Sequence, residues 1–546
     1  MRSVRPVARS VGTADEGIGA VDPGTRQELV ARNRFGRKTA VTSPRAMVVT
    51  DHPLATRAGL EVLRAGGNAC DAALAACAAQ IVLEPDMVTM TGCLSTLHRD
   101  AATGTVTYCN GSPDRPRGHH GPVTDADVET GRGVMVPGWW AGFEAIRERF
   151  GTWSRDAILA QAIEYARDGF EIPPHLYSYE SQMLARIAST PEGRAIYLPE
   201  GTLRLPYERW EQPALAGTLE RFATEGADEF YRGTFARKLV ETVQGAGGAL
   251  SMADLDAYEV RWQEPVRGTY RGYEIVGAPP PDNGGLMLIE VLNLVELLDL
   301  PAMGHQLESA DTLYWLMHIV DTVMGEGTRQ NDPDSHHVPV ELLASKEFAA
   351  HRFELLRMAA PRPRAPVAPP GSCQVTVVDP DGDVVTVMNS SLAHPWINGL
   401  FLDGMSVGAA GGHLRRTAVL PGQRLVLSLC SNMVLRDGRP VVVSGSPAMA
   451  LLANVVQNLV NLLDFGMGIE GSVHLPRFGV TESDAGQRIE LDVPERLRDD
   501  VTARGLTLDV VQPWMFSMGS FDGIVLDDEG LHACADPRRA GAAEGL

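Results

Sequence analysis

The chain has 546 residues, of which 44% are hydrophobic, so it is long enough to bury a large core. Its formal net charge of −21 at pH 7 argues against nucleic acid or an anionic membrane as a partner. Seven cysteines stand singly, with no CxxC pair, which indicates reduced thiols in a reducing compartment rather than a disulfide framework.

The N-terminal residues 1–44 predict a poorly ordered leader, because they are rich in Arg, Gly and Asp. Met1 to Gly19 lacks the apolar core of roughly 7–15 residues that marks a signal peptide. The same stretch is too polar to span a membrane. We therefore expect a cytoplasmic protein.

Residues 45–371 follow as a helix-rich part. Apolar residues recur there at helical spacing, and glycines such as Gly66, Gly151 and Gly169 stand where helices end. The expected helices cover 55–65, 71–82, 139–150, 158–167, 286–300 and 309–325.

Aromatic and histidine pairs in this part favour structural roles. We expect Trp139-Trp140 in the core. The adjacent pairs His119-His120 and His336-His337 lack the i, i+4 helical spacing that points two imidazoles at one metal ion. The sequence therefore predicts no metal site, and it indicates no cofactor.

Residues 372–546 are rich in strand patterns separated by turns such as Asp381-Gly382 and Asp437-Gly438. One helix, over 449–465, interrupts them. A helical first part and a strand-rich second part predict an α/β fold of the layered αββα type. The expected strands are 374–379, 384–389, 400–402, 425–430, 432–435, 440–444, 488–491, 507–511 and 523–527.

The boundary between the two parts has the features of a self-cleavage site. A Pro/Ala-rich run, Pro361 to Pro370, ends at Gly371-Ser372, and a strand follows at once. Oγ of Ser372 could attack the carbonyl carbon of Gly371, and hydrolysis of the resulting ester would leave Ser372 as a new N-terminus. Its α-amine would have a pKa of about 7.7–8.0, which suits a general base at neutral pH.

Short patterns along the chain resemble the γ-glutamyltranspeptidase family of N-terminal-nucleophile hydrolases, and the resemblance covers Ala46 to Gly541. It implies a four-layer αββα sandwich, self-cleavage and an activity on acyl compounds. The matching patterns, in the family's order, are Gly66-Gly67-Asn68 with Asp71, Glu84-Pro85, Val136-Pro137-Gly138, Gly226 to Gly233, Gly247-Gly248, Pro279-Pro280-Pro281 with Gly284-Gly285, Gly445-Ser446-Pro447, Pro476-Arg477 and Cys534 to Arg538.

The resemblance also implies catalytic roles. The family's nucleophile is a Thr at the head of a strand, and Ser372 takes its place with the hydroxyl kept. A second hydroxyl that steadies the nucleophile falls within Asn389-Ser390-Ser391, so Ser390 and Ser391 are the candidates. Two backbone N–H groups after a Gly-Ser-Pro form the oxyanion hole, which here would be those of Ala448 and Met449.

The positions that hold a γ-glutamyl group in the family depart from its pattern. Cys109 stands where an Arg binds the substrate carboxylate, and Ser428-Leu429 replaces a Ser-Ser pair. No carboxylate occurs in 406–412, where the family's acid receives the substrate amine. We expect Cys109, Asn389, Ser428 and Ser446 to contact substrate and glutathione to be a poor one, because a buried charge without a partner is costly.

Three hypotheses from different classes follow. The first is a self-processing hydrolase or acyltransferase of a non-glutathione amide or acyl metabolite. The second is a hydrolase that cleaves a carbon–carbon bond of a keto acid in bacterial specialised metabolism. The third is an unprocessed, non-catalytic homologue. For the first two we expect a small-molecule substrate and a heterodimer of the two self-cleaved chains, with a dimer of that heterodimer left open.

Overall fold

The computed structural model describes most of the chain. The described residues are 35–325, 331–359, 361, 371–394, 396–415, 417, 419–447, 451–483 and 486–546. The expected leader, residues 1–44, lies largely outside them. Its last part differs from that expectation, because β1 (Val41–Ser43) pairs antiparallel with β20 (Gly530–Ala533). The ladder with β20 satisfies the backbone groups of β1 at the edge of a sheet.

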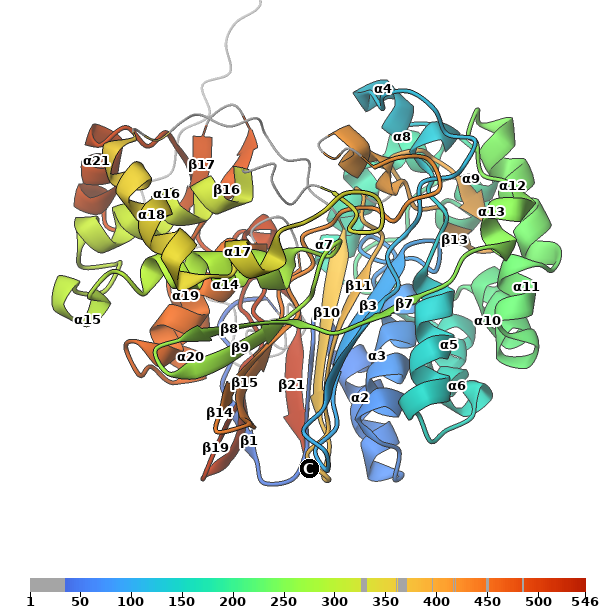
Figure 1. Ribbon diagram of the computed structural model, residues 1–546. Coiled ribbons are helices and arrows are strands. Elements are labelled where there is room, and N and C mark those ends of the chain that lie inside the picture. Colours follow the sequence, from blue (N-terminus) through green and yellow to red (C-terminus); the bar gives the residue numbers. More distant parts are fainter. Residues whose placement is uncertain are drawn as a thin grey trace, which may run out of the picture. The chain divides into compact units, whose positions relative to one another are not determined.

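Two seven-stranded antiparallel sheets form the centre of the fold (Figure 1). The first sheet has the order β1-β20-β19-β15-β14-β9-β8, with β19 Ile524–Asp527, β15 Arg439–Ser444, β14 Asn432–Arg436, β9 Tyr273–Gly277 and β8 Val266–Tyr270. The second has the order β21-β2-β10-β11-β3-β4-β7, with β21 Ala542–Gly545, β2 Met47–Thr50, β10 Ser372–Val378, β11 Val384–Ser390, β3 Cys93–Arg99, β4 Val106–Asn110 and β7 Arg261–Gln263.

Helices cover the outer face of each sheet (Figure 1). On the side of the second sheet and its rim lie α2 (Pro53–Arg64), α3 (Ala69–Leu83), α4 (Asp125–Val128), α5 (Trp139–Phe150), α6 (Arg155–Asp168), α7 (Pro174–Gln182), α8 (Leu184–Ile187), α9 (Pro191–Tyr197), α10 (Pro213–Glu225), α11 (Ala227–Tyr231), α12 (Thr234–Gly245) and α13 (Met252–Asp256). On the side of the first sheet lie α14 (Gly284–Val295), α15 (Leu300–Met303), α16 (Ala310–Gly325), α17 (Val340–Leu343), α18 (Lys346–Met358), α19 (Leu451–Leu463), α20 (Ile469–His474) and α21 (Glu495–Ala503).

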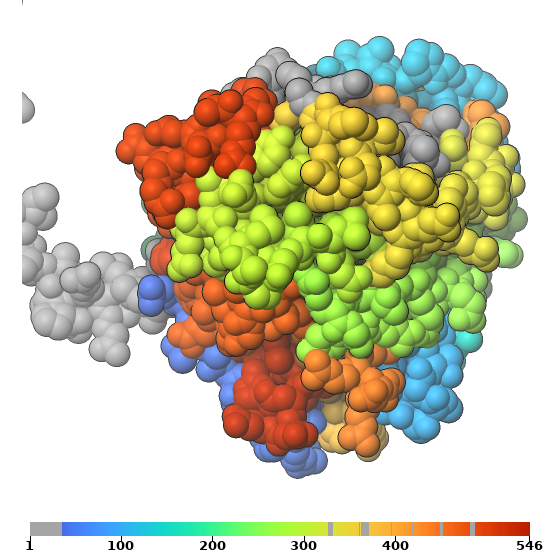
Figure 2. Space-filling view, turned by 60° about the vertical axis from the view of Figure 1, so that its left-hand side comes forward, coloured from blue at the N-terminus to red at the C-terminus, as the bar shows by residue number. Residues whose placement is uncertain are grey.

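Smaller sheets lie outside these four layers. They pair β5 (Phe170–Glu171) with β6 (Arg209–Trp210), β12 (Phe401–Leu402) with β13 (Met405–Ser406), and β16 (Phe478–Ser483) with β17 (Gly486–Glu490) and β18 (Leu508–Val511). In the space-filling view, the helices α14 to α18, coloured yellow-green to yellow, occupy much of one face (Figure 2).

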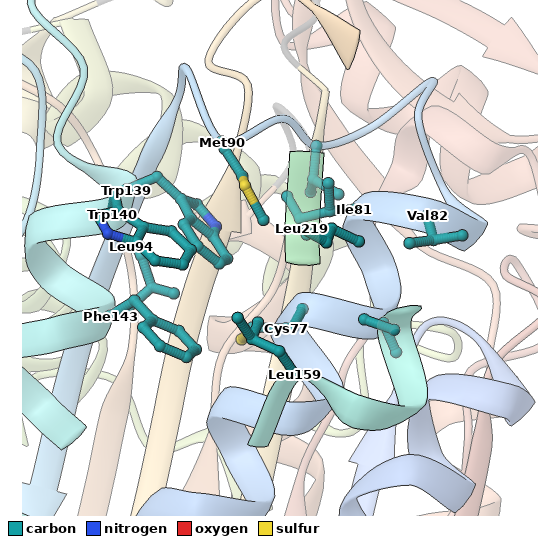
Figure 3. Packing of buried hydrophobic residues seen from close by; sticks show 14 of the residues in the cluster. Cys77, Ile81, Val82, Met90, Leu94, Trp139, Trp140, Phe143, Leu159 and Leu219 are labelled. Atoms are coloured by element: carbon teal, nitrogen blue, oxygen red, sulfur yellow. The ribbon is translucent and has the colours of Figure 1, made fainter. Parts of the chain in front are cut away.

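Three of the four apolar clusters among the described residues join the layers, in agreement with the αββα architecture. One joins the helices around α3 to the second sheet, a second fills the space between the sheets, and a third joins the first sheet to α14, α16 and α19. All residues of α3 are buried, and its many alanines let it approach β10 and β11 closely. Figure 3 shows Trp139, Trp140 and Phe143 of α5 in the first of these cores, as expected for the tryptophan pair.

The expected helices are present, and most of the expected strands are too. One strand prediction was wrong: residues 425–430 form no strand, because Leu425 and Leu427 donate their backbone N–H groups to loop carbonyls of Pro113 and Pro281. Strand β10 begins at Ser372, two residues earlier than expected. Among the described residues, no helix is long and apolar enough to cross a membrane.

Candidate active site

Ser372 and Ser390 face each other at one end of the second sheet. Ser372 opens β10 and Ser390 closes β11, and the register of the two antiparallel strands pairs them directly. The tight turn between Asp379 and Asp383 sets this register, since the Asp379 backbone N–H donates to the Asp383 carbonyl oxygen at 3.1 Å. Directly paired residues put their side chains on the same face of a sheet. Both serines are buried.

A hydrogen-bond chain links the two hydroxyls to the peptide bond before Ser372. The Ser372 and Ser390 Oγ atoms lie 2.7 Å apart. Ser390 Oγ donates to the carbonyl oxygen of Gly371 at 2.7 Å and accepts from the backbone N–H of Leu392 at 2.9 Å. Ser390 Oγ can accept one more hydrogen bond, and the Ser372 hydroxyl is placed to donate it.

Ser391 adds a second hydroxyl at the same carbonyl. Its Oγ lies 3.3 Å from the Gly371 oxygen and 3.0 Å from the oxygen of Ala393. The Gly371 N–H donates to that same Ala393 oxygen at 2.6 Å. The structure thus brings Ser372, Ser390 and Ser391 together at one peptide bond.

Gly371 occupies a space that fits no side chain. A Cβ atom at this position would lie 2.7 Å from Ser391 Oγ and 2.8 Å from the backbone oxygen of Met87. The Met87 oxygen also accepts the backbone N–H of Ser391 at 3.2 Å. The loop that follows α3 therefore closes over the Gly371–Ser372 bond.

Arg539 contacts the first residue of β10. Its Nη1 donates to the carbonyl oxygen of Ser372 at 3.2 Å, and its guanidinium stacks 3.8 Å from the ring centre of Phe516. Asp51 lies beside it, with 4.0 Å between Asp51 Oδ1 and Arg539 Nε. Asp51 accepts from the Gln374 N–H at 2.9 Å and from the Ser520 hydroxyl at 2.6 Å.

Two buried acids, Glu84 and Asp86, interact with this arginine, and a third, Glu180, interacts with Asp86. Burial raises the pKa of the Asp86 carboxyl to about 7 and, with help from Asp86, the pKa of Glu180 in α7 to about 8. Burial raises the pKa of Glu84 well above its ordinary value, and Asp51 and Asp86 add to that effect. A group of buried carboxyls whose pKa values are raised toward neutral pH or above it is typical of functional sites.

Sequence reasoning missed Asp86, Glu180 and Arg539 as site residues. Glu84-Pro85-Asp86 was visible as two acids directly after an apolar, Ala-rich helix, where acids must be buried or cap the helix. Arg539 follows the expected Arg538 directly. Glu180 has no local signal, because it comes from a separate helix.

Asn389 is not brought to the Ser372 hydroxyl. It pairs with Cys373 on the opposite face of the sheet, where its amide nitrogen donates to the Cys77 carbonyl at 3.1 Å and to Gln80 Oε1 at 3.0 Å. The Trp139 indole N–H donates to its Oδ1 at 2.8 Å. Its side chain is thus fully used in fixing α3 and α5 to β11.

Cys109 is buried inside β4, and burial raises its thiol pKa to about 12. A neutral thiol there cannot replace a guanidinium. All seven cysteines are free and buried. The guanidinium groups of two nearby arginines bind other groups. Arg115 donates to the oxygens of His119, Val419 and Gly121. Arg424 donates to Asp114, Asn110 and Glu259.

The remaining expected positions lie in loops. Ser428 is half-buried, and Ser446 is buried with its Oγ accepting from the Asn454 amide at 2.8 Å. Ala448 and Met449 lie outside the described residues. Gly445 faces β10, because a Cβ there would lie 2.4 Å from the Gln374 side chain. The loop before residues 448–449 therefore approaches β10 from the first sheet.

The loop at 406–412 contacts the loop after α3. Thr89 and Thr91 both donate to the Ser406 carbonyl oxygen, at 2.6 and 3.1 Å. Within the described part of the chain, no group of three or more His, Cys, Asp or Glu side chains could hold a metal ion.

Comparison with known proteins identifies relatives over nearly the whole chain. The family model described as Gamma-glutamyltranspeptidase matches residues 55–546. The chain is 31% identical over 506 residues to the acylase ACY 1 proenzyme of Pseudomonas sp. (strain V22), covering 86% of this chain and 88% of that protein. It is 27% identical over 539 residues to the glutathione hydrolase proenzyme of Escherichia coli (strain K12), covering 91% of each. The solved cephalosporin acylase from Bacillus halodurans has the same fold, with a TM-score of 0.83, 24% identity, and coverage of 93% and 97%.

Proposed function

Because the chain belongs to the γ-glutamyltranspeptidase family of N-terminal-nucleophile hydrolases, we propose that it cleaves itself between Gly371 and Ser372 and then hydrolyses or transfers an acyl group. The observation that carries this proposal is the hydrogen-bond chain from the Ser372 hydroxyl through Ser390 to the Gly371 carbonyl oxygen. The family makes it an enzyme of the hydrolase or transferase class, and the curated relatives are named proenzymes.

The chain of hydroxyls supplies the proton transfers that self-cleavage requires. As Ser372 Oγ bonds to the Gly371 carbonyl carbon, its proton passes to Ser390 Oγ, and the Ser390 proton passes to the Gly371 oxygen. Collapse of this tetrahedral intermediate returns a proton to the departing Ser372 nitrogen and leaves an ester. Water then hydrolyses the ester to a Gly371 carboxylate and a free Ser372 hydroxyl.

The groups that stabilise the Gly371 carbonyl oxygen lie at the same peptide bond. The Ser390 and Ser391 hydroxyls lie where negative charge grows during the attack on Gly371. Donors placed at such an oxygen typically contribute about 10²–10³ in rate each. After cleavage, Ser372 carries both the nucleophilic hydroxyl and the α-amine that acts as its base, and the backbone N–H groups of Ala448 and Met449 are proposed to hold the acyl oxyanion.

The substrate class we propose is an amide or acyl compound other than glutathione. Supporting this are the neutral Cys109 in place of the expected guanidinium, the committed side chain of Arg115, and the absence of acids in the sequence 406–412. The similarity to an acylase proenzyme agrees with an amide of a different acyl group. We also propose a reducing compartment, the cytoplasm, supported by the seven free cysteines.

Denaturing electrophoresis tests the proposal. The purified chain is expected to give two fragments, of about 371 and 175 residues, and to turn over acyl p-nitroanilides with hydroxylamine trapping the acyl group as a hydroxamate. A single intact chain without turnover would instead support the non-catalytic homologue.

A further inference from the structure

The Ser390 hydroxyl takes part in three hydrogen bonds, and its single proton decides how they are shared. The Gly371 carbonyl oxygen can only accept, so Ser390 Oγ gives its proton to that oxygen, 2.7 Å away. The backbone N–H of Leu392 donates to Ser390 Oγ at 2.9 Å and occupies one of its two lone pairs. The other lone pair remains for the Ser372 hydroxyl, at 2.7 Å. The Leu392 N–H therefore fixes the direction in which Ser390 passes a proton.

Leu392 presents this N–H from an uncommon backbone conformation. Its φ angle is 57°, in the left-handed region that is unfavourable for a residue with a side chain. The residue follows the end of β11 by two positions, so this conformation turns the chain sharply at the relay hydroxyl. A backbone of this kind persists only where the surrounding structure holds it. The contacts of Leu392 therefore decide where its N–H points.

A histidine side chain binds the same residue at its carbonyl group. The His413 Nε2 atom lies 3.1 Å from the Leu392 carbonyl oxygen. Because that oxygen can only accept, Nε2 carries a proton and donates it. His413 thus holds the peptide plane that follows Leu392, and the orientation of this plane belongs to the same turn as the N–H.

The element that carries His413 is itself anchored. It is the short 3₁₀ helix η2, Ala410–Arg415. Its Leu414 packs with Leu392 in one apolar cluster, and the Thr417 hydroxyl donates to the His413 carbonyl oxygen at 3.1 Å. A side chain on a packed element holds its acceptor in a defined place. The imidazole is therefore a fixed support for the turn at Leu392.

We propose that His413 is a positioning residue for self-cleavage. Through the Leu392 peptide it directs the Ser390 hydroxyl at the bond to be cleaved. Without this support Leu392 relaxes toward negative φ, and its N–H leaves the lone pair of Ser390. The Ser390 proton is then no longer committed to the Gly371 oxygen, and the relay loses its direction. The inference rests on the proposed self-cleavage before Ser372, and it assigns His413 no proton to transfer.

Replacement of His413 tests the inference on the full chain, with the time course of fragment appearance as the readout. His413→Leu removes the donor, and we expect the rate to fall at least about tenfold, because a shift of about 1 Å in a reacting group can cost about 10²-fold. His413→Gln keeps an N–H donor at a similar reach and should recover most of the rate.

A matched control removes a histidine elsewhere. His532 also makes two side-chain contacts, at 2.9 Å to Thr42 Oγ1 and at 2.9 Å to Asp527 Oδ1, but it lies in β20 of the first sheet. His532→Leu is expected to cleave at the native rate. Melting curves are compared in the uncleaved Ser372→Ala background, where the chain with His413→Leu should still melt cooperatively.

A double-mutant cycle separates positioning from a general effect on the structure. In a Ser390→Ala chain the Leu392 N–H has no hydroxyl to direct. Addition of His413→Leu to that chain should therefore slow cleavage little further, whereas independent effects would multiply. If Ser390→Ala gives no fragments at all, the comparison of His413→Leu with His413→Gln decides alone.

Three results would overturn the inference: cleavage of His413→Leu at the native rate, no recovery with His413→Gln, or an undiminished further fall in the Ser390→Ala chain. If His413→Leu does not fold, His413→Asn takes its place, because its amide is one methylene too short for the Leu392 oxygen. A native chain that stays intact would refute the proposed function. A native chain that cleaves, with variants that give one of these three results, refutes only this inference.

Discussion

The hydroxyl oxygens of Ser372 and Ser390 lie 2.7 Å apart across β10 and β11, and Ser390 also donates to the carbonyl oxygen of Gly371. The Ser390 side chain therefore contacts both the proposed nucleophile, Ser372, and the peptide bond that Ser372 is proposed to break. This relationship connects the strand register to self-cleavage, because a shift of β11 by one residue would move Ser390 to the opposite face.

Removal of the nucleophile should stop processing without unfolding the chain. We expect Ser372→Ala to give a folded, uncleaved and inactive protein, and Ser372→Thr still to cleave because it keeps the hydroxyl. Electrophoresis and circular dichroism of both variants check this. Normal two-chain processing of Ser372→Ala would rule out Ser372 as the nucleophile.

Ser390 should matter more than Ser391 for the rate of self-cleavage. Ser390→Ala removes both the proton relay and the 2.7 Å donor to Gly371, so the rate should fall by about 10²–10³, as for the loss of an oxyanion donor. Ser391→Ala removes only the longer 3.3 Å contact and should cost less. The time course of fragment appearance measures both, and Ser390→Thr should recover most of the rate. Equal rates for Ser390→Ala and the native chain would exclude the relay.

An added methyl group at the cleavage site should also slow processing. In Gly371→Ala the new Cβ would lie under 3 Å from Ser391 Oγ and the Met87 oxygen, so the Gly371 carbonyl must move relative to the Ser372 hydroxyl. Gly217→Ala, in the interior of α10 with open space around it, is the matched control and should process normally. The same electrophoretic time course decides between them. A Gly371→Ala chain that cleaves at the control's rate would show that the close packing is irrelevant.

The layers of the fold and the strand that follows Gly371 could be predicted from the sequence, because helical and strand periodicity are local and Gly371-Ser372 stands at a visible change of pattern. The lining of the site could not. Asn389 and Ser390 are neighbours in sequence but point to opposite faces of β11, and only the pairing register decides which one meets Ser372. Glu180 and Arg539 reach the site from elements far away in the chain. Glu180 has no local signal, and Arg539 has only its place directly after the expected Arg538.

γ-Glutamyl-p-nitroanilide and glutathione should be very poor substrates. The buried Cys109 thiol carries no charge near neutral pH, so the γ-glutamyl carboxylate would lack its partner at that position. Loss of one buried charge pair costs roughly 2–5 kcal/mol. Comparison of kcat/KM for γ-glutamyl-p-nitroanilide with that for 4-aminobutanoyl-p-nitroanilide, which lacks only the carboxylate, measures the effect. Comparable values for the two compounds would contradict this account and would direct attention to Arg115 and Arg117.

Glu180 should destabilise the protein at alkaline pH. Its pKa is raised to about 8 by burial, so the folded state binds more protons than the unfolded state between about pH 4 and pH 8 and loses stability as pH rises through that range. Glu180→Gln is therefore expected to raise the melting temperature more at pH 9 than at pH 4. A variant with the same shift at both pH values would mean that Glu180 is paired in the folded protein.

The mass of the purified protein tests the central claim most directly. Under denaturing conditions, mass spectrometry should find two chains, and N-terminal sequencing of the smaller one should begin Ser-Cys-Gln-Val, starting at Ser372. A single intact chain, or a smaller fragment that begins at any other residue, would contradict self-cleavage by the Ser372 hydroxyl.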